Sequence, residues 1–162
     1  MSDASFHLVL FGAGHVGQAL VTLLGQLPCV VQWVDAREAL FPATVPANVA
    51  IEATDTPEAL VDQAPPGAYF LVMTHDHALD FLLAQCIMRR RAVGYFGMIG
   101  SRTKRVKFER RLRERGVAAA RIARMICPVG VPGILGKAPS SIALAVCAEL
   151  LQQPPPASRG WD

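Results

Sequence analysis

Short apolar runs alternate along the chain with longer segments in which apolar residues recur every three or four positions. A short run bounded by glycine, proline or acidic residues predicts a strand that is buried on both faces, whereas the wider spacing predicts an amphipathic helix. Strands are therefore expected at residues 7–11, 30–34, 49–52, 69–73, 94–99 and 125–127. Helices are expected at residues 15–25, 57–63, 78–90, 101–115, 118–124 and 139–151.

The alternation of strands with helices predicts the architecture. Strand–helix–strand units place their strands parallel in one sheet, and the crossovers between them are almost always right-handed. We therefore predict an α/β fold, a Rossmann-like doubly wound parallel sheet in a single domain over residues 1–152. Three consecutive prolines near the end of the chain indicate that residues 153–162 form a disordered tail.

Composition excludes several classes of protein. With 162 residues and 52% hydrophobic side chains, the chain is long enough to bury a core and too apolar for a disordered protein. No apolar run is long enough to span a bilayer, and no basic segment of a signal peptide precedes the first strand. The four cysteines stand far apart without a CxxC pair, which is typical of reduced thiols. We therefore expect a cytoplasmic protein that binds no membrane.

Positive charge is concentrated in one part of the chain. The formal net charge is only +3, yet most of the lysines and arginines lie between Arg89 and Arg115. Two interpretations stay open: a solvated helix face, or a surface for an anionic ligand or partner. Nucleic acid is not expected as that partner, because the nearby aromatic residues are few and are predicted to belong to the core.

A glycine-rich loop, residues 12–17 with the sequence GAGHVG, follows the first predicted strand and opens the first predicted helix. This is the context in which the pattern G-x-G-x-x-G binds a phosphate, with backbone N–H groups and the helix dipole favouring the negative charge. The first glycine allows the tight turn, the second lets a phosphate approach and the third lets the helix pack closely. The candidate ligand-binding residues here are Gly12, Gly14, His15 and Gly17.

An acidic residue, Asp35, ends the second predicted strand. An acid at this point of a dinucleotide-binding fold hydrogen-bonds the 2′-hydroxyl of a ribose. Arg37 follows two residues later and could instead contact a 2′-phosphate, so the pattern does not choose between NAD and NADP. A glycine turn used only for packing is the remaining alternative.

The stretch 72–80, VMTHDHALD, falls after the fourth predicted strand, at the same sheet edge as the glycine loop. A metal site is not expected, because His75 and His77 would diverge and no third cluster of ligands is evident. Asp76 or Thr74 is expected to cap the next helix, and the histidines are expected to face the crevice. These four residues form the predicted wall of a pocket.

A second glycine–serine turn follows the fifth predicted strand, in the sequence GMIGSRTKR. Gly100 frees the backbone, Ser101 is able to cap the helix, and Arg102 and Lys104 follow at once. These four residues are a candidate second anion site on the same sheet edge. The alternative is an ordinary helix cap followed by a basic surface helix.

Together these motifs resemble those of a known family. The stretches FGAGHVGQAL, VDARE, VMTHDHALD, GYFGMIGSRTKRVKF and ICPVGVPGILGKAPSSIALAVCAELL occur in order over residues 8–151. They resemble the C-terminal Rossmann domain of the xanthine dehydrogenase accessory proteins of the XdhC/CoxI type.

The resemblance implies a maturation factor without conventional turnover and without catalytic residues. Such proteins bind the molybdenum cofactor, a phosphorylated pterin (molybdopterin) that carries the metal. They protect it while a cysteine desulfurase or other sulfurase supplies sulfur, and they assist its insertion into the xanthine dehydrogenase apoenzyme. Members commonly carry a further N-terminal domain. Two alternatives stay open here: a separate chain supplies that domain, or this half provides only docking and phosphate recognition. A homodimer is also possible under this hypothesis.

A second hypothesis is an oxidoreductase of Rossmann fold that binds NAD(P). His75 or His77 would then be the proton donor, because the pKa of a histidine lies naturally near neutrality. The short chain counts against this hypothesis, because little of it remains to build a substrate domain once the sheet is complete.

Overall fold

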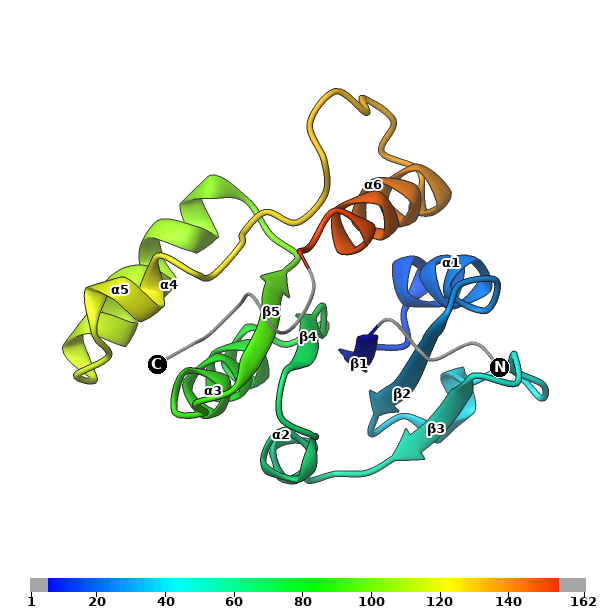
Figure 1. Ribbon diagram of the computed structural model, residues 1–162, viewed down its shortest axis with the longest axis horizontal. Helices are drawn as coiled ribbons and strands as arrows, with labels where there is room; N and C mark the ends of the chain where they lie inside the picture. The colour runs from blue at the N-terminus through cyan, green and yellow to red at the C-terminus, as the bar shows by residue number, and fades with distance from the viewer. Residues whose placement is uncertain (1–5, 155–162) are drawn as a thin grey trace.

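The centre of the molecule is a sheet of five parallel strands in the order β3-β2-β1-β4-β5 (Figure 1). The computed structural model describes residues 6–154. The strands are β1 (Phe6–Phe11), β2 (Cys29–Asp35), β3 (Val49–Ala53), β4 (Ala68–Val72) and β5 (Val93–Met98). The chain starts in the middle, builds outward on one side and then returns to the other, so the strand order switches between β1 and β4. This topology confirms the predicted doubly wound Rossmann-like fold.

Helices cover both faces of the sheet (Figure 1). On one face α1 packs against α6, and on the other α2, α3 and α4 lie side by side. The helices are α1 (His15–Leu24), α2 (Glu58–Gln63), α3 (His77–Met88), α4 (Arg102–Glu114), α5 (Ala119–Ile122) and α6 (Pro139–Leu151), with a short 3₁₀ helix η1 (Glu38–Leu40). No helix in residues 6–154 is both long and apolar enough to cross a bilayer.

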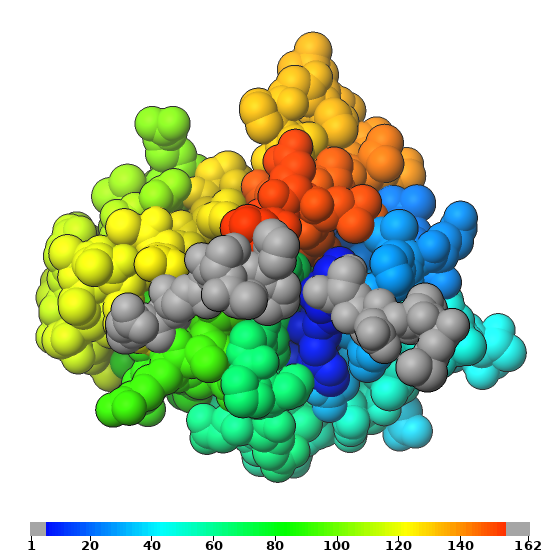
Figure 2. Space-filling view, in the orientation of Figure 1, coloured from blue at the N-terminus to red at the C-terminus, as the bar shows by residue number. Residues whose placement is uncertain are grey.

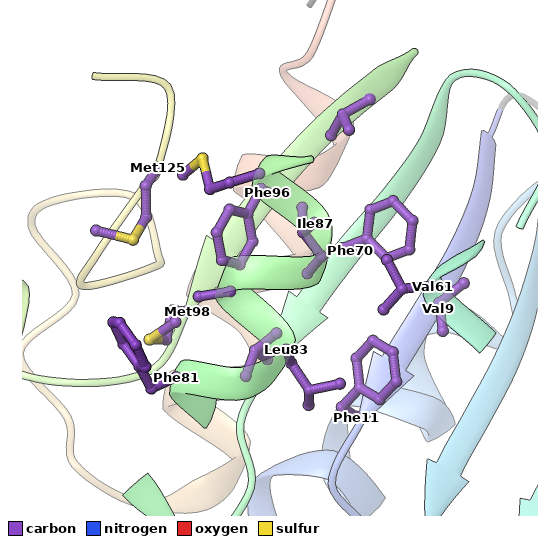
Figure 3. Close-up of a cluster of buried hydrophobic side chains, with 14 of the residues drawn as sticks. Val9, Phe11, Val61, Phe70, Phe81, Leu83, Ile87, Phe96, Met98 and Met125 are labelled. Atoms are coloured by element: carbon purple, nitrogen blue, oxygen red, sulfur yellow. The ribbon is translucent and has the colours of Figure 1, made fainter. Parts of the chain in front are cut away.

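Two hydrophobic cores, one on each face of the sheet, explain why the strands read as continuous apolar runs. In β1, Val9 and Phe11 face α3, whereas Leu8 and Leu10 face α1 and α6. Figure 3 shows the first core, where Phe11 lies near Val61 and Phe81 lies near Met98. Because both faces are covered, the central strands are largely apolar, and the polar pair His7 of β1 and Gln32 of β2 forms a 2.7 Å hydrogen bond of its own.

The sixth predicted strand is wrong. Residues 125–127 form only an isolated parallel bridge, between Ile126 and Gly97 of β5. Ile126 donates its N–H to Phe96 and accepts from Met98, but the ladder does not develop further. Pro128 follows directly and has no N–H to donate, which prevents the regular pairing of a strand at this point.

A long loop rich in glycine and proline joins this bridge to α6 and projects from the surface (Figure 2). Leu135 in this loop is 91% exposed. The predicted disordered tail, residues 153–162, lies almost entirely outside the described residues.

Candidate functional site

The loops that follow β1, β2, β3 and β4 surround a cavity of about 140 Å³ at the carboxyl edge of the sheet, where the strands end. Its apolar lining comes from Phe11, Val34, Ala36, Pro57 and Leu79. Its polar lining comes from Asp35, Asp55, Thr74 and His75, with Gly12 beside them. The fold thus brings four of the predicted site residues together, namely Gly12, Asp35, Thr74 and His75, in the place where open α/β sheets bind their ligands.

The glycine loop packs closely against the end of β4 and against α1. Gly12 has a φ of +121°, and a Cβ on it would lie 2.3 Å from the carbonyl oxygen of Met73. A Cβ on Gly17 would lie 2.4 Å from the carbonyl oxygen of Gly12, which also accepts a 2.9 Å hydrogen bond from the indole of Trp33. The predicted tight turn at Gly12 and the predicted close packing at Gly17 are therefore both confirmed.

Gly14 occupies a different environment from the other two glycines. It is the N-cap of α1, it makes no side-chain cap, and a Cβ on it would meet no atom within 4 Å. His15 is also exposed. The N-terminus of α1 is thus exposed at Gly14 and His15, where the helix dipole favours an anion.

The carboxylate of Asp35 is already occupied by protein donors. It accepts hydrogen bonds from the N–H of Ala13 at 2.8 Å and from Arg37, whose Nε and Nη2 lie at 3.0 and 2.9 Å. Burial raises the pKa of Asp35, but these hydrogen bonds and the charge of Arg37 outweigh it, so the net pKa lies below its ordinary value. The acid expected to bind a ribose instead holds the glycine loop, and Arg37 pairs with it.

Asp35→Asn is expected to lower the free energy of unfolding by about 1–3 kcal/mol at pH 7, because charge-assisted hydrogen bonds to a buried carboxylate are lost. A depressed folded-state pKa stabilises the protein above the unfolded value near 4, and this contribution disappears as the pH falls through the folded-state pKa. Urea denaturation at several pH values should therefore show the difference between the two proteins shrinking below about pH 4. A difference that stays constant over that range would contradict this role of the ionised carboxylate.

The loop after β4 has the predicted helix cap. Asp76 Oδ1 accepts hydrogen bonds from the N–H groups of Ala78 and Leu79 at 2.9 and 3.3 Å, which confirms Asp76 as the cap of α3. His75 lines the cavity, whereas the exposed His77 is not among its lining residues. The two histidines, predicted to face one crevice together, are therefore separated.

A buried ion pair fastens this loop to α4. Lys104 Nζ lies 2.7 Å from Asp80 Oδ2 and donates to the carbonyl oxygen of Ile99 at 2.8 Å, while Thr74 Oγ1 donates to Asp80 Oδ1 at 2.6 Å. Asp80 is fully buried and Lys104 is 8% exposed. The sequence pattern indicated an external anion as the partner of Lys104. In the structure its ammonium group binds Asp80 and a backbone carbonyl of the protein itself. Local patterns did not indicate this pairing, because the two residues are 24 positions apart.

The second glycine–serine turn opens a separate hollow. Ser101 caps α4 by accepting from the N–H of Lys104 at 3.2 Å, as predicted for an ordinary cap, and Gly100 has a φ of +159°. The exposed Arg102 lines a hollow of about 280 Å³ together with Arg105 and Cys127. Burial raises the pKa of the Cys127 thiol, which is 1% exposed. The glycine–serine turn lies on the same sheet edge as the glycine loop, but it does not line the cavity that contains Asp35 and His75.

Within residues 6–154, no group of three or more His, Cys, Asp or Glu side chains is arranged to hold a metal ion.

Comparison with known proteins adds three findings. The family model of the XdhC Rossmann domain matches residues 8–150. YqeB of Escherichia coli (strain K12) is 35% identical over 151 residues, which cover 90% of this chain and 27% of YqeB. A Bacillus halodurans crystal structure titled as a xanthine dehydrogenase superposes with a TM-score of 0.76 and 22% identity, covering 92% of this chain and 42% of that one. The last likeness is one of fold, and this chain spans less than half the length of either protein.

Proposed function

Since the chain belongs to the XdhC Rossmann-domain family, we propose that it is an accessory factor in the maturation of xanthine dehydrogenase. In this proposal it binds the molybdenum cofactor and assists the sulfuration of that cofactor and its insertion into the apoenzyme. The partners are the xanthine dehydrogenase apoenzyme and a cysteine desulfurase or other sulfurase. A separate chain that carries a further domain is an additional proposed partner.

The observation that carries the proposal is the combination of a ring-sized cavity with an open helix N-terminus on one sheet edge. The cavity has apolar walls that suit a flat heterocycle, and it adjoins the loop that leads into α1. At Gly14 the backbone is open, so a phosphate is able to approach the first N–H groups of α1. A phosphorylated pterin has both parts, a planar ring and an anionic group, and the residues present therefore fit it.

In this arrangement the protein's own contribution is to bind and shield. The buried pair of Lys104 and Asp80 holds Thr74, and thereby the loop that carries His75, in a fixed position. Asp35 holds the glycine loop through the N–H of Ala13. Two of the four loops that border the cavity are thus fixed by buried carboxylates before any ligand arrives, which reduces the ordering cost of binding.

Binding of NAD(P) by an oxidoreductase is the second candidate. The observation that favours it is the position of the cavity beside Asp35, where Rossmann folds bind the adenosine half of a dinucleotide. Its weak point is that the Asp35 carboxylate and the Arg37 guanidinium, the two groups expected to read the ribose, bind each other.

The two candidates predict different ligands. Protein purified from cells that make molybdopterin should carry pterin fluorescence and molybdenum, and protein from cells that cannot make it should carry neither. NADH and NADPH are titrated in parallel and should show no saturable binding. Saturable nicotinamide binding with hydride transfer to a substrate would overturn the maturation proposal.

Gly14→Val tests the placement of the anionic group. A side chain here meets no protein atom, so the fold should be retained, but it fills the space above the first N–H groups of α1. We expect at least about a tenfold loss of affinity for the retained cofactor, equivalent to about 1.4 kcal/mol. Unchanged cofactor retention, with an unchanged melting temperature, would move the anion site away from this helix.

A further inference from the structure

We propose that the carboxyl-edge cavity recognises the 2-amino-4-oxopyrimidine edge shared by pterins and guanine, and that Asp55 is the residue that reads it. The inference rests on the proposed function and deepens it. It names the ring that enters the cavity and the residue that distinguishes this ring from adenine.

The size of the cavity limits what enters it. At about 140 Å³ it is close to the roughly 150 Å³ engineered cavity that holds one benzene ring, and well below the roughly 300–1,000 Å³ of pockets for whole drug-sized ligands. Phe11 and Val34 from strand ends, with Pro57 and Leu79 from the helical side, form its apolar walls. A single flat heterocycle therefore enters, and the rest of the ligand stays outside.

The polar groups around the cavity are not equally available. Asp35 is saturated by Arg37 and by the N–H of Ala13, and the single hydroxyl hydrogen of Thr74 is donated to Asp80 at 2.6 Å. Asp55 also lines the cavity, is exposed, and forms no hydrogen bond or ion pair with the part of the chain that the structure describes. The His75 imidazole also lines the cavity and forms no hydrogen bond with the described residues, but only Asp55 offers a carboxylate that is not already occupied.

The chemistry of a carboxylate selects the base. An ionised carboxylate only accepts hydrogen bonds, and its two oxygens match two parallel donors. The 2-amino-4-oxopyrimidine edge offers such a pair, a ring N–H beside an exocyclic amino group. Adenine offers an amino group beside a ring nitrogen that is itself an acceptor, so the lone pair of that nitrogen would face the negative charge. Asp55 thus favours pterin and guanine and disfavours adenine.

Titration calorimetry with neopterin, GMP and AMP tests the inference. The wild-type chain should bind neopterin and GMP more tightly than AMP. Asp55→Asn keeps the shape but replaces one acceptor oxygen by a donor, and it should weaken neopterin and GMP by about tenfold or more while leaving AMP unchanged or improved. Asp62→Asn, at an exposed acid on α2, is the matched control and should change none of the three.

The remaining outcomes are informative in different ways. Tighter binding of neopterin than of GMP identifies a pterin as the source of the edge, and the reverse order identifies a guanine nucleotide; both support the inference. Equal binding of AMP and GMP, or unchanged affinities in Asp55→Asn at an unchanged melting temperature, overturns it. If Asp55→Asn has no effect but the purified protein still carries pterin and molybdenum, the inference fails and the proposed function stands. If wild-type protein carries no pterin from competent cells and binds no probe, both fail.

Discussion

Replacing Lys104 with methionine is expected to lower the free energy of unfolding by about 3–5 kcal/mol. The substitution removes the cation from a carboxylate that is fully buried, and Asp80 then keeps only the two donors of Thr74. A buried charge without its counterion costs far more than the intact pair contributes, because water cannot replace the missing partner. Urea denaturation followed by circular dichroism measures the change.

A double-mutant cycle separates this pair from simple loss of packing. In Asp80→Asn combined with Lys104→Met no buried charge remains and Thr74 keeps an acceptor, so the double variant should be more stable than the sum of the single effects predicts, by about 1–3 kcal/mol. Lys107→Met, on an exposed position of the same helix, should stay within about 0.5 kcal/mol of wild type. Additive single effects, or a Lys104 variant as stable as the Lys107 control, would contradict the role of the pair.

Loss of the Lys104–Asp80 pair should also weaken ligand binding. The same carboxylate that accepts from Lys104 accepts from the N–H and hydroxyl of Thr74, which lines the cavity. We therefore expect the Lys104 variant to bind ligand more weakly even under conditions where it remains folded.

Gly12→Ala is the other substitution with a large expected effect, a loss of about 2–5 kcal/mol of unfolding free energy. An alanine would have to adopt a φ of +121°, and its Cβ would lie 2.3 Å from the carbonyl oxygen of Met73, an atom of the backbone that has little room to move. Strained backbone and overpacking each cost about 1–3 kcal/mol. Because β1 is the middle strand of the sheet and β4 lies beside it, any relief of this clash would disturb the sheet edge that carries the cavity.

Gly14→Ala is the matched control in the same loop. Gly14 has an ordinary φ of −73°, and an added Cβ meets nothing within 4 Å. The free energy of unfolding of this variant should therefore lie within about 0.5 kcal/mol of the wild-type value. Thermal and urea denaturation of the two variants compare them directly. Similar stability of Gly12→Ala and Gly14→Ala would show that the loop is not constrained as the geometry requires.

The sequence predicted correctly those features that depend on residues close together in the chain. The apolar runs and the helical spacing predicted the five strands and the six α-helices of residues 6–154, because burial on two faces leaves a continuous apolar stretch. The glycine loop was interpretable because its turn and its packing depend on residues a few positions apart. Residues 125–127 were wrongly predicted as a strand, because they form an apolar run. Pro128, which follows them, prevents regular strand pairing.

The sequence by itself determined the Rossmann-like architecture, the sheet edge at which the candidate loops meet and the family to which they belong. The tertiary structure alone decided what each charged group does there: Asp35 binds Arg37 and the glycine loop, Lys104 pairs with Asp80, and Asp55 has no partner among residues 6–154. The physical reason is one of distance along the chain. Hydrophobic periodicity is written into consecutive residues, whereas the pairing of charges depends on which side chains, 24 positions apart in the case of Asp80 and Lys104, the completed fold buries beside each other.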